Sequence, residues 1–233
     1  MAENGWTFEP GAGVIPDSVN GAKLMHQIYT AADAQYSGRV TVPVLWDKKT
    51  ATIVSNESSE IIRMFNSEFD ALGAQSGDYY PNALRPEIEA LNARIYATLN
   101  NGVYRCGFAT TQTAYEAAIT PLFDTLDWLE GILANTRYLT GPDITEADWR
   151  LFTTLIRFDP VYVGHFKCNL RRIVDYPNLS NYLRDLYQQP GIAETVNMQH
   201  IKEHYYASHD SINPSRVVPK GPTIDFSQPH NRG

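Results

Sequence analysis

The sequence has few cysteines, few basic residues and no long apolar run, and each shortage excludes a class of protein. Two cysteines, Cys106 and Cys168, are too few for a disulfide framework in 233 residues, so a cytoplasmic location is expected. The 19 Lys and Arg against 26 Asp and Glu give a net charge of −7, which argues against a nucleic-acid partner. No run approaches the roughly 20 apolar residues of a membrane span, and the N-terminus does not resemble a signal peptide. We therefore expect a globular protein with no membrane partner.

Strand signals are confined to the first third of the chain. Residues 22–32 predict a short helix, and residues 40–46 and 51–54 predict two strands joined by a turn. Residues 55–57 supply a capping side chain and an acidic first turn, which predict the start of a second helix. A hairpin and one helix cannot bury both faces of a sheet. We therefore expect that the part of the domain that should cover this sheet is absent.

Helical periodicity dominates after the turn-rich linker at residues 73–78, and we expect helices over 86–101, 112–134, 146–164 and 178–204. One start is sharply marked, because Thr145 and Asp148 can form a capping box while Ile144 packs on Trp149. The fold class is therefore mostly α. We expect a partial first domain at 1–72, a helical domain at 73–210 and an extended or disordered tail at 211–233, which holds four prolines and two glycines.

Two motifs suggest chemistry that we weigh against simpler interpretations. His200, Glu203 and His204 match the H-x-x-E-H pattern of zinc hydrolases, but the chain has no Glu after Glu203 to complete such a site. An amphipathic helix end is the simpler interpretation, so we expect no metal. Cys106 and Cys168 each follow a cation, yet neither lies in a Cys-x-x-Cys or Cys-Pro pair. We interpret both as bystanders.

A proline inside the first predicted strand suggests a ligand site. Pro43 removes a ladder donor, and a cis Val42–Pro43 bond would turn the backbone of Val42 outward, toward an extended peptide. Thirteen residues later, the amides of a helix start, the Ser58 hydroxyl and the Glu57 carboxylate could together hold a carboxylate and an ammonium. This combination fits glutathione, although an edge proline and an ordinary helix cap are the better explanation when these residues are taken alone.

A family resemblance favours the glutathione interpretation. Six segments in family order, spread over essentially the whole chain, resemble the glutathionyl-hydroquinone reductases, which form the xi class of glutathione transferases and are called omega-like in fungi. They are residues 4–8 (NGWTF), 36–47 (YSGRVTVPVLWD), 53–62 (IVSNESSEII), 101–110 (NGVYRCGFAT), 157–167 (RFDPVYVGHFK) and 200–206 (HIKEHYY).

The resemblance implies a thioredoxin-like first domain, incomplete here, an all-helical glutathione transferase C-terminal domain and a homodimer. It implies glutathione as co-substrate and aromatic glutathionyl conjugates (hydroquinones) as substrates: a cysteine thiolate takes the glutathionyl sulfur, and a second glutathione resolves the mixed disulfide. It places glutathione against Trp6, Arg39, Val40, Thr41, Val42, Glu57 and Ser58. Catalytic phenols would be Tyr104, Tyr162 and Tyr205, since a phenol can donate a proton to the leaving ring or a hydrogen bond to a thiolate.

The family's nucleophile, a cysteine in a Cys-Pro-Trp-Ala motif, has no counterpart in these residues, which contain no Cys-Pro pair. We therefore expect glutathione contacts without the attacking thiolate, and no hydroquinone-reductase turnover by the chain as written. The alternative from another class is a non-catalytic protein that binds glutathione conjugates.

Overall fold

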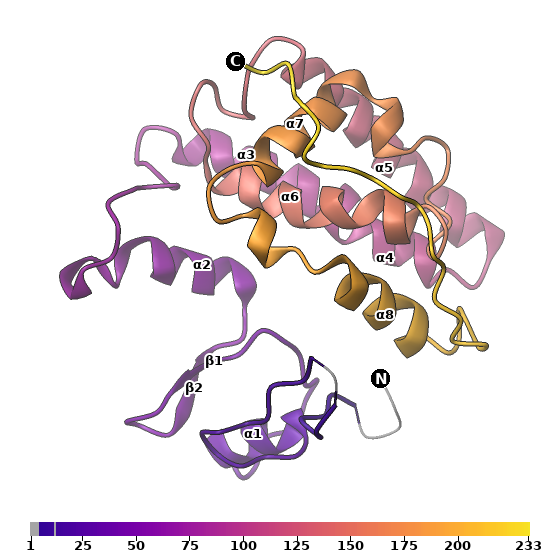
Figure 1. Ribbon diagram of the computed structural model, residues 1–233. Helices are drawn as coiled ribbons and strands as arrows, with labels where there is room; N and C mark the ends of the chain where they lie inside the picture. Colours follow the sequence, from indigo (N-terminus) through magenta and orange to yellow (C-terminus); the bar gives the residue numbers. More distant parts are fainter. Residues whose placement is uncertain (1–4, 12) are drawn as a thin grey trace. The chain divides into compact units, whose positions relative to one another are not determined.

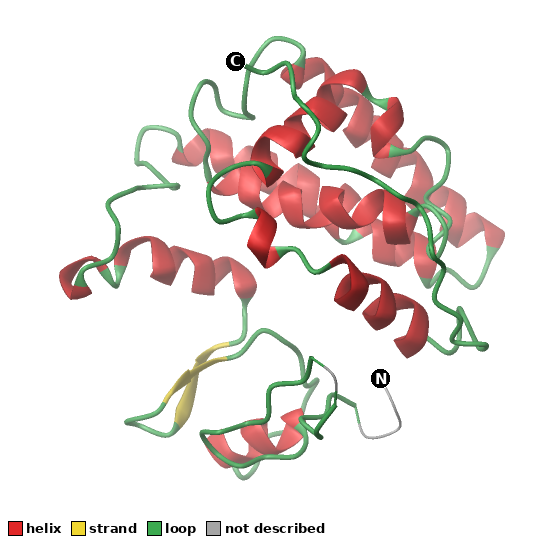
Figure 2. Cartoon of the chain, in the orientation of Figure 1, coloured by secondary structure: helices red, strands yellow, loops and turns green. Residues whose placement is uncertain are grey.

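The computed structural model describes residues 5–11 and 13–233, which divide into two compact units, Met1–Asp78 and Tyr79–Gly233 (Figure 1). Helices dominate, and a single two-stranded sheet is found among the described residues (Figure 2), so the predicted mostly-α class is confirmed. Within that part of the chain, no helix combines the length and the apolar character of a membrane span.

The first unit is built around a hairpin flanked by helices. Strands β1 (Leu45–Asp47) and β2 (Thr52–Ser55) pair antiparallel, with Trp46 opposite Ile53, as the predicted turn at 47–50 requires. The Asp47 carboxylate accepts the backbone N–H of Lys49 and holds that turn closed. The helical elements of the unit are α1 (Met25–Ala32), α2 (Ser58–Ser67) and the short 3-10 helix η1 (Asp70–Leu72).

The predicted strand at 40–46 is largely wrong, because only its last two residues enter the sheet. The Val42–Pro43 peptide bond is cis, and Thr41 forms its backbone hydrogen bonds elsewhere. Its carbonyl accepts the hydroxyl of Tyr29 at 2.8 Å, and its N–H donates to that same hydroxyl at 3.2 Å. A side chain of α1 therefore takes the place of a neighbouring strand at this position.

The second unit contains helices and loops but no β-strand among its described residues. Its elements are α3 (Arg85–Ile95), the π-helix η2 (Tyr96–Asn100), α4 (Gly102–Gly107), α5 (Gln112–Leu133), α6 (Glu146–Arg157), the π-helix η3 (Phe158–Tyr162), the 3-10 helices η4 (Ile173–Asp175) and η5 (Ala193–Thr195), α7 (Pro177–Tyr187) and α8 (Met198–Ser208).

Helix α5 lies at the centre of this unit, because it packs against α4, η2 and α7. Leu122, Leu126 and Leu129 recur at helical spacing along its inner face and are fully buried. The hydroxyl of Thr111 caps the helix by accepting the N–H of Ala114. Helix α6 packs on α3, η3 and α7, and α8 packs on η3.

The capping box predicted at the start of α6 is confirmed. The Asp148 carboxylate accepts the N–H of Thr145 at 2.8 Å, and the reciprocal bond from the Asp148 N–H to the Thr145 side chain is also formed. Asp148 is completely buried and also accepts the hydroxyl of Tyr182 and the N–H of Leu139. This one carboxylate therefore holds the start of α6, the preceding loop and α7 together.

Two predicted helices have different limits in the structure. The segment predicted over 178–204 divides into α7 and α8, because Pro190 and Gly191 interrupt it and Gly191 takes a positive φ of 80°. The segment predicted over 146–164 changes from α-helix to the π-helix η3 at Phe158, two residues before Pro160. The apolar periodicity continues across both changes, so it did not reveal them.

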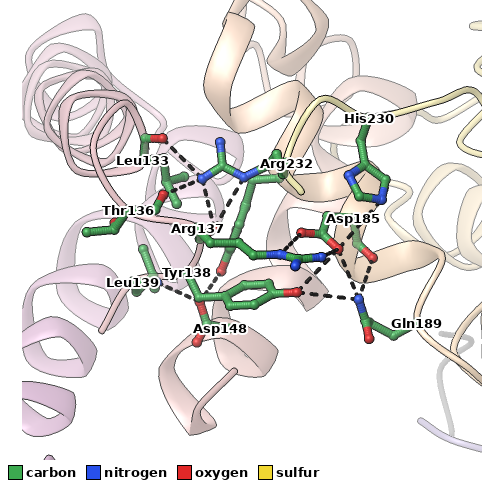
Figure 3. Close-up of polar contacts among 11 residues, drawn as sticks. Leu133, Thr136, Arg137, Tyr138, Leu139, Asp148, Asp185, Gln189, His230 and Arg232 are labelled. Atoms are coloured by element: carbon green, nitrogen blue, oxygen red, sulfur yellow. Dashed lines mark hydrogen bonds and ion pairs between the residues drawn. The ribbon is translucent and has the colours of Figure 1, made fainter. Parts of the chain in front are cut away.

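The last residues lie against the helical unit in an extended course (Figure 1). The Gln188 side-chain amide donates to the Phe226 and Gln228 carbonyls, each at 2.8 Å. The Arg232 guanidinium donates to carbonyls at and beyond the end of α5, those of Leu133, Thr136 and Arg137. Figure 3 shows this contact beside the buried Asp185 carboxylate. That carboxylate accepts hydrogen bonds from the side chains of Arg137, Tyr138 and Gln189.

Candidate functional site

The first unit holds one candidate site, at the start of α2. Glu57 is the N-terminal capping position, and Ser58 is the first residue of the helix. The Ser55 hydroxyl accepts the Glu57 N–H at 3.1 Å and donates to the Glu60 carboxylate at 2.8 Å, which fixes the turn into the helix. Glu57 and Ser58 are both exposed. The helix start therefore presents a carboxylate, a hydroxyl and first-turn amides to a ligand.

A network centred on Tyr29 joins this helix start to the predicted peptide-binding segment. Asn56 donates its side-chain amide to the Tyr29 hydroxyl at 3.2 Å and to the Thr41 hydroxyl at 3.3 Å. Tyr29 is buried, and its ring packs on Tyr36, whose hydroxyl donates to the Arg39 carbonyl at 2.6 Å. The structure therefore brings the 39–42 segment and the 57–58 helix start together.

The remaining predicted residues of the first unit lie around this network. Arg39 and Thr41 are exposed, Val40 is half-buried, and Val42 is 42% exposed. Trp6 lies beside the start of α1, where its carbonyl accepts the Met25 N–H at 3.0 Å and Thr7 pairs with Leu24. Sequence reasoning did not assign Tyr29 and Asn56 to the site. Nothing in the sequence indicates that the Tyr29 hydroxyl bonds the backbone of Thr41, or that the Asn56 amide bonds that hydroxyl.

The second unit holds a separate candidate site, a triad of phenols. Tyr104 of α4, Tyr162 of η3 and Tyr205 of α8 are brought together, as the resemblance predicted. The Tyr205 hydroxyl lies 2.5 Å from that of Tyr104 and 2.9 Å from that of Tyr162. Tyr162 and Tyr205 are 2% and 4% exposed, whereas Tyr104 is 38% exposed. The chain of hydroxyls therefore leads from the core to a phenol that solvent can reach.

Burial sets the protonation of the two inner phenols. It raises the pKa of Tyr162 well above that of an ordinary phenol, and the neighbouring Tyr104 and Tyr205 reinforce the effect. Burial is also the main reason that the pKa of Tyr205 is raised. Both groups keep their protons at neutral pH. The two hydroxyl pairs form a continuous relay, and in each pair either hydroxyl can be the donor.

Phe166 packs the triad into one cluster. Its ring stacks on Tyr162 with centroids 5.5 Å apart, tilts against Tyr104 at 5.4 Å and meets Tyr205 edge-on at 5.7 Å. The close approach requires Gly107, where a Cβ would lie 2.1 Å from the Phe166 ring. Sequence reasoning missed both residues, and the family segments containing them were the only available signal.

A pair of histidines supports the far side of Phe166. His165 Nε2 lies 3.1 Å from His209 Nδ1, and the His209 ring stacks on Phe166. Burial lowers the pKa of His209 to about 4, with further lowering by His165 and His204. Burial, followed by Lys167, lowers the pKa of His165 as well. Both rings are therefore neutral at pH 7, so one can donate and the other accept.

The π-helix η3 positions Tyr162 through an acidic side chain. The Asp159 carboxylate accepts the N–H of Ile173 at 2.6 Å and that of Val174 at 3.1 Å. The Tyr162 carbonyl accepts the Cys168 N–H at 2.9 Å. These bonds fix the loop that follows η3, and they hold Tyr162 and Phe166 in one rigid segment.

The zinc alternative finds no support within the part of the chain that the structure describes. No group of three or more His, Cys, Asp or Glu side chains gathers there in a way that could hold a metal ion. Glu203 accepts the side-chain amide of Gln199, and His204 packs edge-on against Tyr205. Of the pattern residues, His204 therefore packs on a phenol, whereas His200 and Glu203 are exposed.

Comparison with known proteins gives a consistent assignment. The family described as "Glutathione S-transferase, C-terminal domain" matches residues 112–185. Glutathionyl-hydroquinone reductase PcpF from Sphingobium chlorophenolicum is 62% identical over 222 residues, which cover 95% of this chain and 71% of PcpF. Glutathionyl-hydroquinone reductase YqjG from Escherichia coli is 59% identical over 233 residues, which cover 100% of this chain and 71% of YqjG.

Solved structures agree with the sequence comparison. The glutathione-bound structure of YqjG, a glutathione transferase homologue, superposes with a TM-score of 0.97 at 59% identity, covering 100% of this chain and 76% of that one. A xi-class glutathione transferase from Natrialba magadii gives a TM-score of 0.97 at 48% identity, covering 100% of this chain and 71% of that one. The chain therefore belongs to the xi class of glutathione transferases, the family of the glutathionyl-hydroquinone reductases.

Proposed function

We propose that the first unit binds glutathione and that the phenol triad of the second unit binds the hydroxylated ring of a glutathionyl-hydroquinone. The observation that carries the proposal is the hydroxyl chain from Tyr162 through Tyr205 to Tyr104, which ends on the exposed phenol. A hydroquinone presents hydroxyls that both donate and accept hydrogen bonds, as a phenol does. An exposed tyrosine hydroxyl above an apolar aromatic cluster matches that chemistry.

The glutathione part rests on charge and hydrogen-bond complementarity. Glutathione carries an ammonium and two carboxylates at its ends, with extended peptide backbone between them. The Glu57 carboxylate suits the ammonium, and the amides and hydroxyl at Ser58 suit the neighbouring carboxylate. The Arg39–Val42 segment, which the Tyr29 network holds beside this helix start, offers backbone groups to the peptide. The glutathione-bound YqjG structure supports this choice of ligand.

The triad supplies proton chemistry to the reaction of the family. When a thiolate takes the glutathionyl sulfur, the aryl carbon–sulfur bond breaks, a disulfide forms and the ring carbon gains a proton. In this proposal Tyr104 delivers that proton, and Tyr205, whose hydroxyl lies 2.5 Å from that of Tyr104, can replace it along the relay. Burial keeps Tyr162 and Tyr205 protonated, so the relay is loaded at neutral pH.

The attacking thiolate is the part that these 233 residues do not supply. They contain no Cys-Pro pair, and the thiols of Cys106 and Cys168 are buried in the core of the helical unit. We infer that the polypeptide binds glutathione and its aromatic conjugates without reducing them. Non-catalytic binding of glutathione conjugates is thus the second candidate function, and the same absence of a Cys-Pro pair favours it.

Titration calorimetry with glutathione tests the first unit. Replacing Glu57 with Gln removes the ammonium partner while keeping size and polarity, and we expect affinity to fall at least about tenfold, as for loss of a charged hydrogen bond. Glu68→Gln, at the opposite end of α2, is the matched control and should bind as the unchanged protein does. Equal affinity of Glu57→Gln and Glu68→Gln would refute this site.

Titration with a glutathionyl-hydroquinone tests the triad. Tyr104→Phe removes the terminal hydroxyl and should weaken binding of this conjugate about fivefold to tenfold, while glutathione affinity stays unchanged. Tyr96→Phe removes an exposed hydroxyl from η2 in the same unit and should change neither affinity. If both variants bound the conjugate equally, the triad would have no role in recognising the ring.

Two wider expectations from the resemblance remain proposals. A homodimer is expected from the family, and sedimentation of the purified chain would test it. A reducing, cytoplasmic location is expected because the two cysteines form no disulfide in the structure.

A further inference from the structure

Three Asn-Gly pairs occur in the sequence, at residues 4–5, 20–21 and 101–102. Asparagine is a thermolabile side chain, and a following glycine has no side chain that shields its backbone nitrogen from the asparagine amide. The two reacting groups belong to adjacent residues, so no packing is needed to bring them together. Asn4 lies outside the described residues, and the structure places the other two pairs in opposite settings.

The Asn20–Gly21 pair lies in an exposed turn that one carboxylate orders. The Asp17 carboxylate accepts the backbone N–H groups of Val19, Asn20 and Ala22 at 3.0, 3.1 and 3.0 Å. Among the described residues, the Gly21 N–H donates no hydrogen bond. Gly21 takes a positive φ of 68°, and nothing lies within 4 Å of the place where a Cβ would be. Asn20 and Gly21 are both exposed, so water reaches both reacting groups.

The Asn101–Gly102 pair provides a contrast within the same chain. Asn101 joins η2 to α4 with helical backbone angles, φ −87° and ψ −25°. Its N–H donates to the Tyr96 carbonyl at 2.9 Å, and its carbonyl accepts the Arg105 N–H at 3.1 Å. Gly102 is buried. Rotation of the Asn101 backbone would break these hydrogen bonds, so a reaction here requires local opening of both helices.

We propose that Asn20 is a modification site that deamidates spontaneously through a succinimide formed with Gly21. Hydroxide removes the proton of the Gly21 nitrogen, which attacks the carbonyl carbon of the Asn20 side chain. A C–N bond forms and closes a five-membered ring, while the side-chain nitrogen leaves as ammonia. Water then opens the ring at either of its two carbonyls, which gives aspartate or isoaspartate. The net reaction turns one amide and one water into a carboxylate and an ammonium ion, and it needs no oxidant.

Isoaspartate would change the course of the chain beside a predicted glutathione contact. Its backbone passes through the former side chain and is one carbon longer than the unmodified backbone. Three residues later, the Lys23 carbonyl accepts the Phe8 N–H at 2.8 Å, and the Met25 N–H donates to the Trp6 carbonyl at 3.0 Å. We expect the longer turn to loosen this pairing. This consequence, unlike the deamidation itself, rests on the proposed binding of glutathione by the first unit.

Peptide mapping of the whole chain tests the proposal. The folded protein is incubated in mildly alkaline buffer, digested with trypsin, and each gain of about 1 Da is assigned to one asparagine by fragmentation. We expect Asn20 to convert at least about tenfold faster than Asn101, with part of the product labelled by an isoaspartyl methyltransferase. Equal conversion of the two asparagines, or an Asn20 that stays intact, would overturn the proposal.

Two substitutions separate the added charge from the altered backbone. Asn20→Gln should gain no mass at this position, because its longer side chain would have to close a six-membered ring. Freshly purified Asn20→Asp carries the new charge on an ordinary backbone and should bind glutathione as the unchanged protein does. The isoaspartate form, separated from aged protein by ion exchange, should bind several-fold more weakly.

The two measurements fail independently. Equal glutathione affinity of the isoaspartate form and the unchanged protein would refute the effect on binding, and mass gain in Asn20→Gln at the rate of the unchanged protein would refute the site. The peptide map involves no glutathione, so a fresh chain that binds none would contradict the proposed function and leave the modification site standing.

Discussion

Each unit of the chain is stabilised internally by a different kind of interaction. Among its described residues, the buried apolar side chains of the first unit are Ile28, Tyr29 and Ile61, and hydrogen bonds from Tyr29 and Asn56 fix the segment at residues 39–42. The second unit has one continuous apolar core that includes α5, α6 and α7. Two of its three candidate phenols, Tyr162 and Tyr205, belong to that core, whereas Tyr104 is 38% exposed.

This difference teaches how each unit's candidate site is preorganised. In the first unit, polar bonds between short segments hold backbone groups in place, and such bonds contribute little net stability each. In the second unit, close packing fixes the phenols, so their geometry is as stable as the core itself. We therefore expect binding of glutathione to stabilise the first unit much more than binding of a ring stabilises the second.

Amide hydrogen exchange gives the largest expected contrast between the units. Buried amides of α5 and α6 should exchange at least about 1,000-fold more slowly than those of α1 and the hairpin, because little apolar burial opposes local opening of the first unit. Mass spectrometry after timed exchange and peptic digestion would measure the difference. Equal protection in the two units would show that polar bonds alone hold the first unit as firmly as the core holds the second.

A glycine pair tests whether packing fixes the phenols. Gly107→Ala should destabilise the helical unit by about 3 kcal/mol, because the added Cβ would overlap the buried Phe166 ring. Urea unfolding followed by circular dichroism would measure the loss.

Gly131→Ala is the matched control for that substitution. It places the same methyl group in open space on α5 and should stabilise the protein by about 0.5 kcal/mol through helix propensity. If both substitutions changed stability equally, close packing around Phe166 would not be the cause.

The histidine pair predicts a pH dependence of the second unit. The pKa of His209 is about 4 in the folded protein and about 6.5 when unfolded, so its contribution is present above pH 6.5 and is lost as pH falls through 4. We expect the stability advantage of the unchanged protein over His209→Gln to shrink by roughly 2 kcal/mol between pH 7 and pH 4. His200→Gln, on the exposed face of α8, should show no such convergence. Parallel stability curves for His209→Gln and the unchanged protein would contradict the assignment.

The smallest expected effect concerns the polar network of the first unit. Tyr29→Phe leaves the Thr41 backbone groups without their partner and should cost about 1 kcal/mol, together with several-fold weaker glutathione binding. Tyr36→Phe removes an exposed hydroxyl bond to Arg39 in the same unit and should cost less than half as much. The ranking would be reversed if the exposed bond to Arg39, and not the buried network, held the segment.

Local sequence patterns predicted the helices and strands of the chain better than the positions where helices break or change type. The hairpin turn at 47–50, the capping box at Thr145 and Asp148 and the α5 helix each depend on nearby residues, and each is found in the structure. The two π-helices and the break at Pro190 were missed, because the apolar spacing on either side of them is continuous.

The functional residues could be predicted only through the family resemblance. Tyr104, Tyr162 and Tyr205 are distant in sequence, and no spacing rule brings their hydroxyls within bonding distance. The residues that position them, Phe166 and Gly107, depend on a ring contact between separate helical segments.

The most direct test of the account follows one sample of the 233-residue chain through binding and turnover. A glutathionyl-hydroquinone is titrated in a calorimeter, and then, with glutathione added, released hydroquinone is quantified by chromatography. We predict binding heat, abolished by the double variant Glu57→Gln/Tyr104→Phe, with hydroquinone released no faster than in buffer. Rapid release of hydroquinone by the chain, or the absence of binding heat, would contradict the claim that these residues recognise the conjugate but lack the attacking thiolate.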